Sequence, residues 1–218
     1  MLTRFVCLAN SYKEGGRCLA GVQLDEGGKP VIINRRPKWV RPICHTPHNE
    51  IPAHLTESVH VLDILQVDIT EHPPSGFQSE NAFFDEGSLQ VLGQLRPDSL
   101  PSLCEVRPLI FGNRGKAVSE DRIDLIPYSL MMVSTRNFEV VERTSEYDDF
   151  SHTRLVFRYN LDTYDLPITD PVFLHRYKLD PDLLEGVEEL YLTLSLGVNW
   201  NHWYYKLVGC VLHSKQGL

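Results

Sequence analysis

Short apolar runs separated by polar turns extend along most of the chain, and they predict β-strands more often than helices. The first pair is the clearest, because apolar residues 5–9 and 18–24 flank a polar tip at residues 10–17. This arrangement predicts a β-hairpin. Gly15 and Gly16 supply the positive φ angles that its turn requires.

A similar hairpin is predicted near the end of the chain, at residues 194–212. Leu196 stands 13 residues before Gly209, just as Leu8 stands 13 residues before Gly21. The repeat indicates two related β units, each with a glycine on its second strand where a barrel bends or another backbone approaches closely. A chance likeness between two hydrophobic hairpins is the alternative.

The remaining pattern predicts further short strands and two or three short helices. One helix is expected over residues 85–95, with the first or second of these residues as its N-cap. Another is expected to begin at Asp170, with Pro171 in the first helical position. Residues 106–111 are predicted as a strand.

These elements predict a mainly β protein with a few short helices, arranged as two tandem OB-like small barrels. The first OB-like unit is predicted at residues 1–120 and the second at residues 121–218, with the connection near residues 119–127. The sequence has no glycine-rich fingerprint of a phosphate-binding βαβ unit.

The composition of the 218 residues, 42% hydrophobic and 23% charged, is that of an ordinary globular protein. No stretch approaches the ~20 apolar residues that a membrane-spanning helix needs, and the N-terminal run is too short and polar for a signal peptide. We therefore expect a cytoplasmic protein. The five cysteines include no CxxC pair and are expected as free, mostly buried thiols.

The net charge of −8 is unevenly distributed along the chain. Residues 1–43 hold eight Lys and Arg against three Asp and Glu, or +5, so the other residues hold 13 against 26, or −13. A basic end on an acidic body favours a focused anion site over a surface that coats any duplex. Chance clustering of surface charges is the alternative.

Two segments of the basic end carry candidate binding residues. The hairpin tip offers Lys13 and Arg17 together with small hydrogen-bonding groups. In residues 35–42, two prolines exclude a helix and Trp39 stands among four cations, a combination typical of sites for single-stranded nucleic acid or a nucleotide. An edge strand whose Trp39 plugs a barrel end would explain the same residues equally well.

The sequence supports a metal site or a catalytic site less well than a binding site. Cys44, His45 and His48 match no four-ligand spacing for zinc. A magnesium site would need the loop carboxylates around Asp165, but Asp170 already has a capping role. We therefore predict no metal, no cofactor and no enzymatic activity.

Five stretches, CLANSYKEGGRCLAGV, WVRPI, YDLPITDPVF, YLTLSLG and YYKLVGCVL, together resemble the dual OB-containing domain family of bacteria and archaea. The resemblance covers nearly the whole chain. It implies two OB folds in tandem, binding of nucleic acid or a nucleotide, and a setting in prokaryotic conflict or antiphage systems. The matching positions are Asn10, Ser11, Lys13, Cys18, Gly21, Trp39, Arg41, Pro42, Asp165, Asp170, Ser195, Leu196, Gly197, Tyr205 and Lys206.

The sequence thus predicts a module that binds nucleic acid, above all single-stranded DNA or RNA, as a component of a prokaryotic defence system with a possible protein partner and no membrane. Phosphate contact, stacking and hydrogen bonding are expected from Asn10, Ser11, Lys13, Arg17, Arg35, Arg36, Lys38, Trp39, Arg41, Tyr205 and Lys206. The alternative is a nucleotide sensor or protein-interaction adaptor, with the aromatic residues at 200–205 lining a pocket or an interface.

Overall fold

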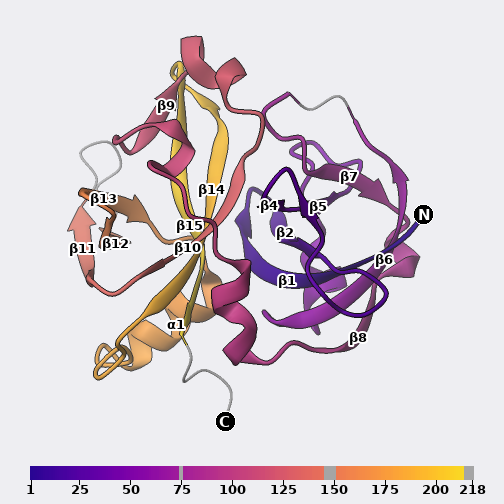
Figure 1. The fold of residues 1–218 in the computed structure, drawn as a ribbon, viewed down its shortest axis with the longest axis horizontal. Helices are drawn as coiled ribbons and strands as arrows, with labels where there is room; N and C mark the ends of the chain where they lie inside the picture. The colour runs from indigo at the N-terminus through magenta and orange to yellow at the C-terminus, as the bar shows by residue number, and fades with distance from the viewer. Residues whose placement is uncertain (74–75, 145–150, 214–218) are drawn as a thin grey trace.

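A computed structural model describes residues 1–73, 76–144 and 151–213, and it contains two β units that lie side by side (Figure 1). The first unit, coloured indigo to magenta, is a closed barrel. The second, pink through orange to yellow, is a more open barrel made of two sheets. The predicted fold class, mainly β with two OB-like barrels in tandem, is confirmed.

In the first unit, five strands pair in the order β1-β2-β5-β7-β6, and β6 returns to β1 to close the barrel. β5 and β7 are parallel, whereas the other pairs are antiparallel. The barrel strands are β1 (Leu2–Lys13), β2 (Gly16–Gln23), β5 (Trp39–Ile43), β6 (Asp63–Glu71) and β7 (Asn81–Phe84). Outside the barrel lie the small hairpin of β3 (Ile32–Ile33) and β4 (Arg36–Pro37), and β8 (Gln90–Gln94) at the edge of β6.

The predicted first hairpin is confirmed, with Gly15 at φ +77° in its turn. Gly21 is required by a close approach of two strands, because a Cβ there would lie 1.9 Å from the carbonyl oxygen of Val6. Gly209 is less confined, since a Cβ there would lie 3.7 Å from that of Ala9. It stands instead where the register of β14 and β15 shifts, as in a β-bulge.

The second unit contains one sheet in the order β10-β14-β15-β9 and another in the order β11-β12-β13. A parallel bridge between Ile168 and Val208 joins them. If β10 and β11 are counted as one interrupted first strand, the second unit continues with β12, β13, a helix, β14 and β15. The five barrel strands of the first unit follow one another in the same order. The elements are β9 (Ala117–Ser119), β10 (Leu130–Thr135), β11 (Phe138–Thr144), β12 (Ser151–Tyr159), β13 (Asp162–Pro167), α1 (Pro171–Leu179), β14 (Leu190–Trp200) and β15 (Trp203–His213).

The predicted start of α1 is confirmed. Oδ1 of Asp170 accepts hydrogen bonds from the backbone N–H groups of Val172 and Phe173, both at 3.0 Å, and Pro171 occupies the first turn. Oδ2 accepts from the N–H of Val211 at 3.1 Å, which fastens the helix to β15. Burial raises the pKa of Asp170.

Two predicted elements are wrong. Residues 85–95 form a single turn, η2 (Glu86–Ser88), followed by β8, because the segment pairs with β6 along the barrel edge and leaves Val91 and Leu92 exposed. Residues 106–111 form no strand; the turn η4 (Ile110–Gly112) instead inserts two apolar side chains into the second core. The other short 3-10 helices are η1 (Ala53–Thr56), η3 (Pro97–Leu103) and η5 (Glu120–Leu125).

The predicted boundary between residues 120 and 121 stays a prediction, and β9, just before it, pairs with β15 in the second unit. Within the described ranges, no helix has the length and apolarity needed to cross a membrane. All five cysteines are free, and Cys7, Cys44 and Cys210 are buried.

Apolar side chains fill each barrel, and a third cluster packs the two units together. This cluster joins Leu8 and Val22 of the first unit to Met132 and Leu212 of the second. The two units therefore share a hydrophobic core and do not merely follow one another along a linker.

A buried carboxylate, that of Glu80, crosses the same boundary. Its Oε1 accepts hydrogen bonds from the N–H groups of Ser129 at 2.7 Å and Leu130 at 3.0 Å. Its Oε2 accepts from the Ser129 hydroxyl at 3.2 Å. The Glu80 carbonyl accepts from the N–H of Arg41 at 2.8 Å, and the Ser129 carbonyl accepts from that of Leu196 at 2.9 Å. Glu80 thus ties β5 of the first barrel to the start of β10 of the second, and Ser129 extends the link to β14.

Glu80→Ala is expected to lower the free energy of unfolding by about 3 kcal/mol, because it leaves buried donors without an acceptor. Glu80→Gln should cost only about 1 kcal/mol, since its carbonyl oxygen still accepts from both N–H groups. Urea unfolding measures both. Glu57→Ala, at an exposed position, is the control, and equal losses in Glu57→Ala and Glu80→Ala would contradict the role of Glu80.

Candidate functional site

A groove of about 840 Å³ opens on the second unit, over β12, β13 and the start of β15. We call it the basic groove. Its walls are formed by Arg114, Lys116, Arg143, Thr144, His152, Arg154, Thr163, Tyr164, Asp165, Pro167, Trp200, Tyr205, Lys206 and Leu207.

Positive charge dominates this lining. Five Lys and Arg side chains face one carboxylate, that of Asp165, although the chain as a whole carries −8. Arg114 is 77% exposed and pairs with Asp162 at 3.1 Å, and Lys116 is also exposed. Cations gathered in a concave surface focus an electrostatic field that attracts anions.

Asp165 on β13 orients two of these cations. Its Oδ1 lies 2.5 Å from Nε of Arg154 on β12, and its Oδ2 lies 3.0 Å from Nε of Arg143 at the end of β11. Arg154 also donates a hydrogen bond to the Asp165 carbonyl at 2.7 Å. Because each guanidinium is a planar fork of five donors, one carboxylate can fix its plane and leave other edges toward the groove.

Aromatic rings stand at one end of the groove. Trp200 and Trp203 face each other across the β14–β15 turn, in which Asn201 and His202 adopt φ of 50° and 68°. Trp200 is 52% exposed, and its ring lies 5.8 Å from that of Tyr205. An exposed indole beside a row of cations has the composition of a stacking platform for bases.

Lys206 closes the bottom of the groove and is fully buried. Its Nζ donates to the Asn113 carbonyl at 2.9 Å and to the Asn113 Oδ1, and it lies 5.0 Å from the Tyr164 ring centre. Burial lowers the pKa of Lys206 to about 7. An anion bound nearby would favour the charged form, so binding in the groove would be coupled to proton uptake.

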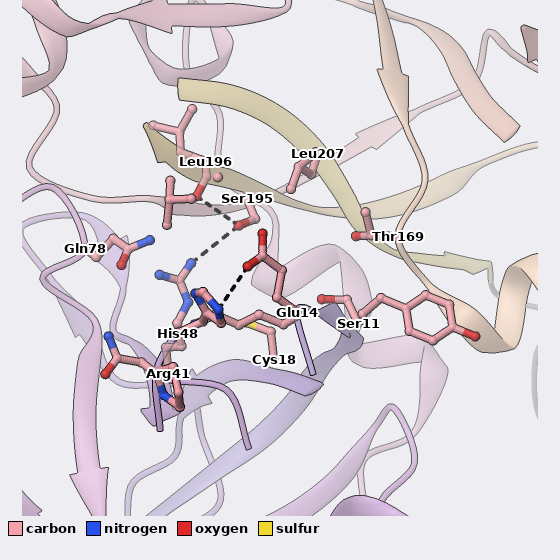
Figure 2. Close-up of a pocket in the computed structure, with 16 residues that line it drawn as sticks. Ser11, Glu14, Cys18, Arg41, His48, Gln78, Thr169, Ser195, Leu196 and Leu207 are labelled. Carbon is pink, nitrogen blue, oxygen red and sulfur yellow. Dashed lines mark hydrogen bonds and ion pairs between the residues drawn. The ribbon is translucent and has the colours of Figure 1, made fainter. Parts of the chain in front are cut away.

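A second cavity, of about 510 Å³, lies between the two units (Figure 2). We call it the interunit pocket. Figure 2 shows the Arg41 guanidinium extending toward Ser195, and Glu14 facing His48 at 3.2 Å. The walls are formed by Ser11, Tyr12, Lys13, Glu14, Cys18, Arg41, Pro47, His48, Asn49, Gln78, Thr169, Ser195, Leu196, Gly197, Val198 and Leu207.

The two cavities occupy corresponding faces of the two barrels. From the first barrel, the interunit pocket takes the end of β1 together with Cys18 of β2 and Arg41 of β5, the second and third strands, and the basic groove lies over β12 and β13, the second and third strands of the other. This face is where OB folds generally bind ligands. In the first unit, β14 and β15 of the second unit form one wall over it, whereas the described residues that line the basic groove all lie between Arg114 and Leu207.

The structure divides the predicted binding residues between these cavities. Ser11, Lys13 and Arg41 line the interunit pocket, and Tyr205 and Lys206 line the basic groove. The single groove that the sequence predicts for the N-terminal cations and Trp39 is therefore not formed.

The remaining predicted residues line neither cavity. Trp39 is only 6% exposed, and its Nε1 donates to the buried carboxylate of Glu105 at 3.3 Å. Arg36 binds the same carboxylate at 2.9 Å and lies over the Tyr128 ring. Stacking of a base on Trp39 is thus wrong, because the indole is part of the core, as the barrel-plug alternative describes. Arg35 lies in the exposed β3–β4 turn, and Lys38 lies between β4 and β5.

At the hairpin tip, two predicted residues make internal contacts. The side-chain amide of Asn10 donates to the carbonyls of Thr56 and Val59 at 3.4 and 3.1 Å. The guanidinium of Arg17 lies 4.8 Å from the centre of the Tyr12 ring. Both therefore serve the local structure of the tip.

Sequence reasoning missed four of the five basic side chains of the groove, namely Arg114, Lys116, Arg143 and Arg154, and it placed Trp200 in a pocket or an interface only under the alternative of a sensor or adaptor. The turn at residues 112–116 is glycine-flanked and basic, but that composition is equally typical of an ordinary hairpin turn. These segments meet only in the folded chain: β12 pairs with both β11 and β13, a bridge joins residue 168 to β15, and β15 pairs with β14 and β9.

Comparison with known proteins identifies the family. The model of the family described as dual OB-containing domain matches residues 3–211. No curated protein sequence matches the chain significantly.

Two solved structures show distant similarity. A chain from a structure described as "Molecular basis for abrogation of activation of pro-inflammatory cytokines" is 12% identical with a TM-score of 0.36, over 97% of this chain and 92% of that chain. A chain of a replication protein A heterotrimer bound to ssDNA is 8% identical with a TM-score of 0.36, over 96% of this chain and 49% of that chain. Neither bears on the ligand of this protein.

The lowered pKa of Lys206 predicts a pH dependence of stability. Between about pH 7 and pH 10, the unfolded chain keeps this lysine protonated while the folded chain holds it neutral, so raising the pH favours folding by up to about 1.4 kcal/mol per pH unit. Lys206→Met removes this contribution. The free energy of unfolding of the wild type should therefore rise relative to that of Lys206→Met across this range, as measured by urea unfolding at several pH values.

The exposed Lys29→Met is the control, and its difference from the wild type should stay constant with pH. Parallel pH profiles for wild type and Lys206→Met would show that Lys206 keeps an ordinary pKa.

Proposed function

The chain belongs to the dual OB-containing domain family, and we propose that it binds single-stranded nucleic acid in the basic groove of its second unit. The observation that carries the proposal is the coincidence of three arginines, an exposed lysine and an exposed tryptophan with the face that OB folds use for oligonucleotides. Family membership supplies the fold, and the lining of the groove supplies the chemistry.

Each part of the groove has a role in this proposal. Arg114, Lys116 and Arg143, at its exposed rim, contact phosphates. Trp200 and Tyr205 provide rings on which bases stack, and stacking tolerates any base because every base has a π-face. Specificity for the single strand follows, since a paired base is not available to stack on a side chain.

The overall charge favours the same class of ligand. A duplex presents phosphates along its whole length. The protein, with a net charge of −8, repels the phosphates that lie outside the groove. A flexible single strand can follow the groove and keep its contacts local. The finer assignment to a prokaryotic conflict or antiphage system rests on the family resemblance, and it remains a proposal together with a cytoplasmic location and the lack of catalytic activity.

Two substitutions test the groove directly. Trp200→Ala should weaken the binding of a short oligothymidylate by about 1–3 kcal/mol through lost stacking. Lys116→Ala should weaken binding to every sequence and reduce the slope of log K against log salt by about 0.7, because one phosphate contact is lost. Fluorescence anisotropy titrations at several salt concentrations measure both effects.

Lys29→Ala removes an exposed lysine far from the groove in sequence and outside its lining, so it is the matched control for charge. Wild-type affinity and salt slope in the double variant Lys116→Ala/Trp200→Ala would overturn the proposed function.

A further inference from the structure

The interunit pocket differs from the basic groove in being walled by both units. We propose that it is a second, separate ligand site, which takes a small organic anion of mononucleotide size with its phosphate at Arg41 and Lys13. This inference uses other residues than the proposed function and does not depend on it.

The guanidinium of Arg41 is buried in this pocket without a counterion among the described residues. Its side chain is 2% exposed, and the only hydrogen bonds from its guanidinium to described side chains are long, at 3.3 Å to Asn81 and 3.4 Å to Ser195. Its Nε has no partner, and no carboxylate of a described residue forms an ion pair with it. A buried charge without a counterion is unfavourable, so a ligand anion would complete this site.

Lys13 brings a second positive charge to the same pocket. Burial lowers the pKa of Lys13, and the nearby charge of Arg41 acts in the same direction. Two cations that repel each other in a partly desolvated pocket both gain from a bound phosphate. The carboxylate in the lining, Glu14, is 74% exposed and pairs with His48, so it does not neutralise Arg41.

The remaining walls suit a ligand with one anionic group and one flat ring. Leu196, Val198 and Leu207 supply an apolar surface from the second unit. Asn49 and Gln78 supply hydrogen-bonding groups from the first. The volume of about 510 Å³ lies within the range of small-molecule sites, and residues of β14 and β15 wall the pocket on the side of the second unit.

A thermal-shift assay tests the site with 5′-AMP, 5′-GMP, 5′-CMP and 5′-UMP as probes, and with the matching nucleosides and orthophosphate as controls. At least one nucleotide should raise the melting temperature, because a ligand that binds only the folded state stabilises it. Its nucleoside should not. Lys13→Met, which keeps the apolar stem, should weaken the apparent affinity about tenfold or more, whereas Lys29→Met should leave it unchanged.

Arg41→Met gives a second and opposite readout. Without ligand, it should melt at a higher temperature than the wild type because it removes a buried, uncompensated charge, yet it should no longer respond to the nucleotide. If Arg41→Met fails to fold, Lys13→Met decides alone.

Three results would overturn the inference: no shift with any nucleotide, equal shifts with nucleotide and nucleoside, or an unchanged response in Lys13→Met. A nucleotide response that survives in Lys13→Met but is lost in Lys116→Ala/Trp200→Ala would place the ligand in the basic groove. If the wild type responds to a nucleotide as expected but binds no oligonucleotide, only the proposed function is contradicted.

Discussion

The buried carboxylate of Glu80 sets the relation between the two barrels. It accepts three hydrogen bonds from Ser129 and Leu130, and its own carbonyl positions the backbone of Arg41. Because Ser129 in turn binds the backbone of Leu196, the second unit is held with β14 across the ligand face of the first. A buried carboxylate with all its partners across an interface permits few other arrangements.

This one constraint gives two similar barrels different surfaces. The face of the first barrel becomes a pocket walled by both units with a buried guanidinium, while the face over β12 and β13 is lined by the second unit and carries five Lys and Arg side chains. A pocket of small-molecule size favours a small ligand of defined shape, and a larger basic groove with an exposed aromatic ring favours a chain that passes along it. A tandem of related folds can thereby carry two kinds of recognition.

Features encoded by neighbouring residues were predictable from the sequence. The Gly15 turn, the close approach at Gly21 and the Asp170 cap depend on local geometry. The sequence left two interpretations of Trp39 open, a stacking surface and a barrel plug, and only the structure decides between them, because its partner Glu105 lies 66 residues away. The basic groove was missed for a similar reason: its cations come from separate segments that only strand pairing unites, and their charge is hidden in an acidic total.

The most direct measurement is hydrogen exchange of the whole protein with and without a short oligothymidylate, because it reports which strands the ligand covers. Protection is predicted in β12, β13 and the turn between β14 and β15, with residues 10–41 unchanged. Protection confined to residues 10–41, with no change over β12 and β13, would contradict the assignment of nucleic acid to the open face of the second barrel.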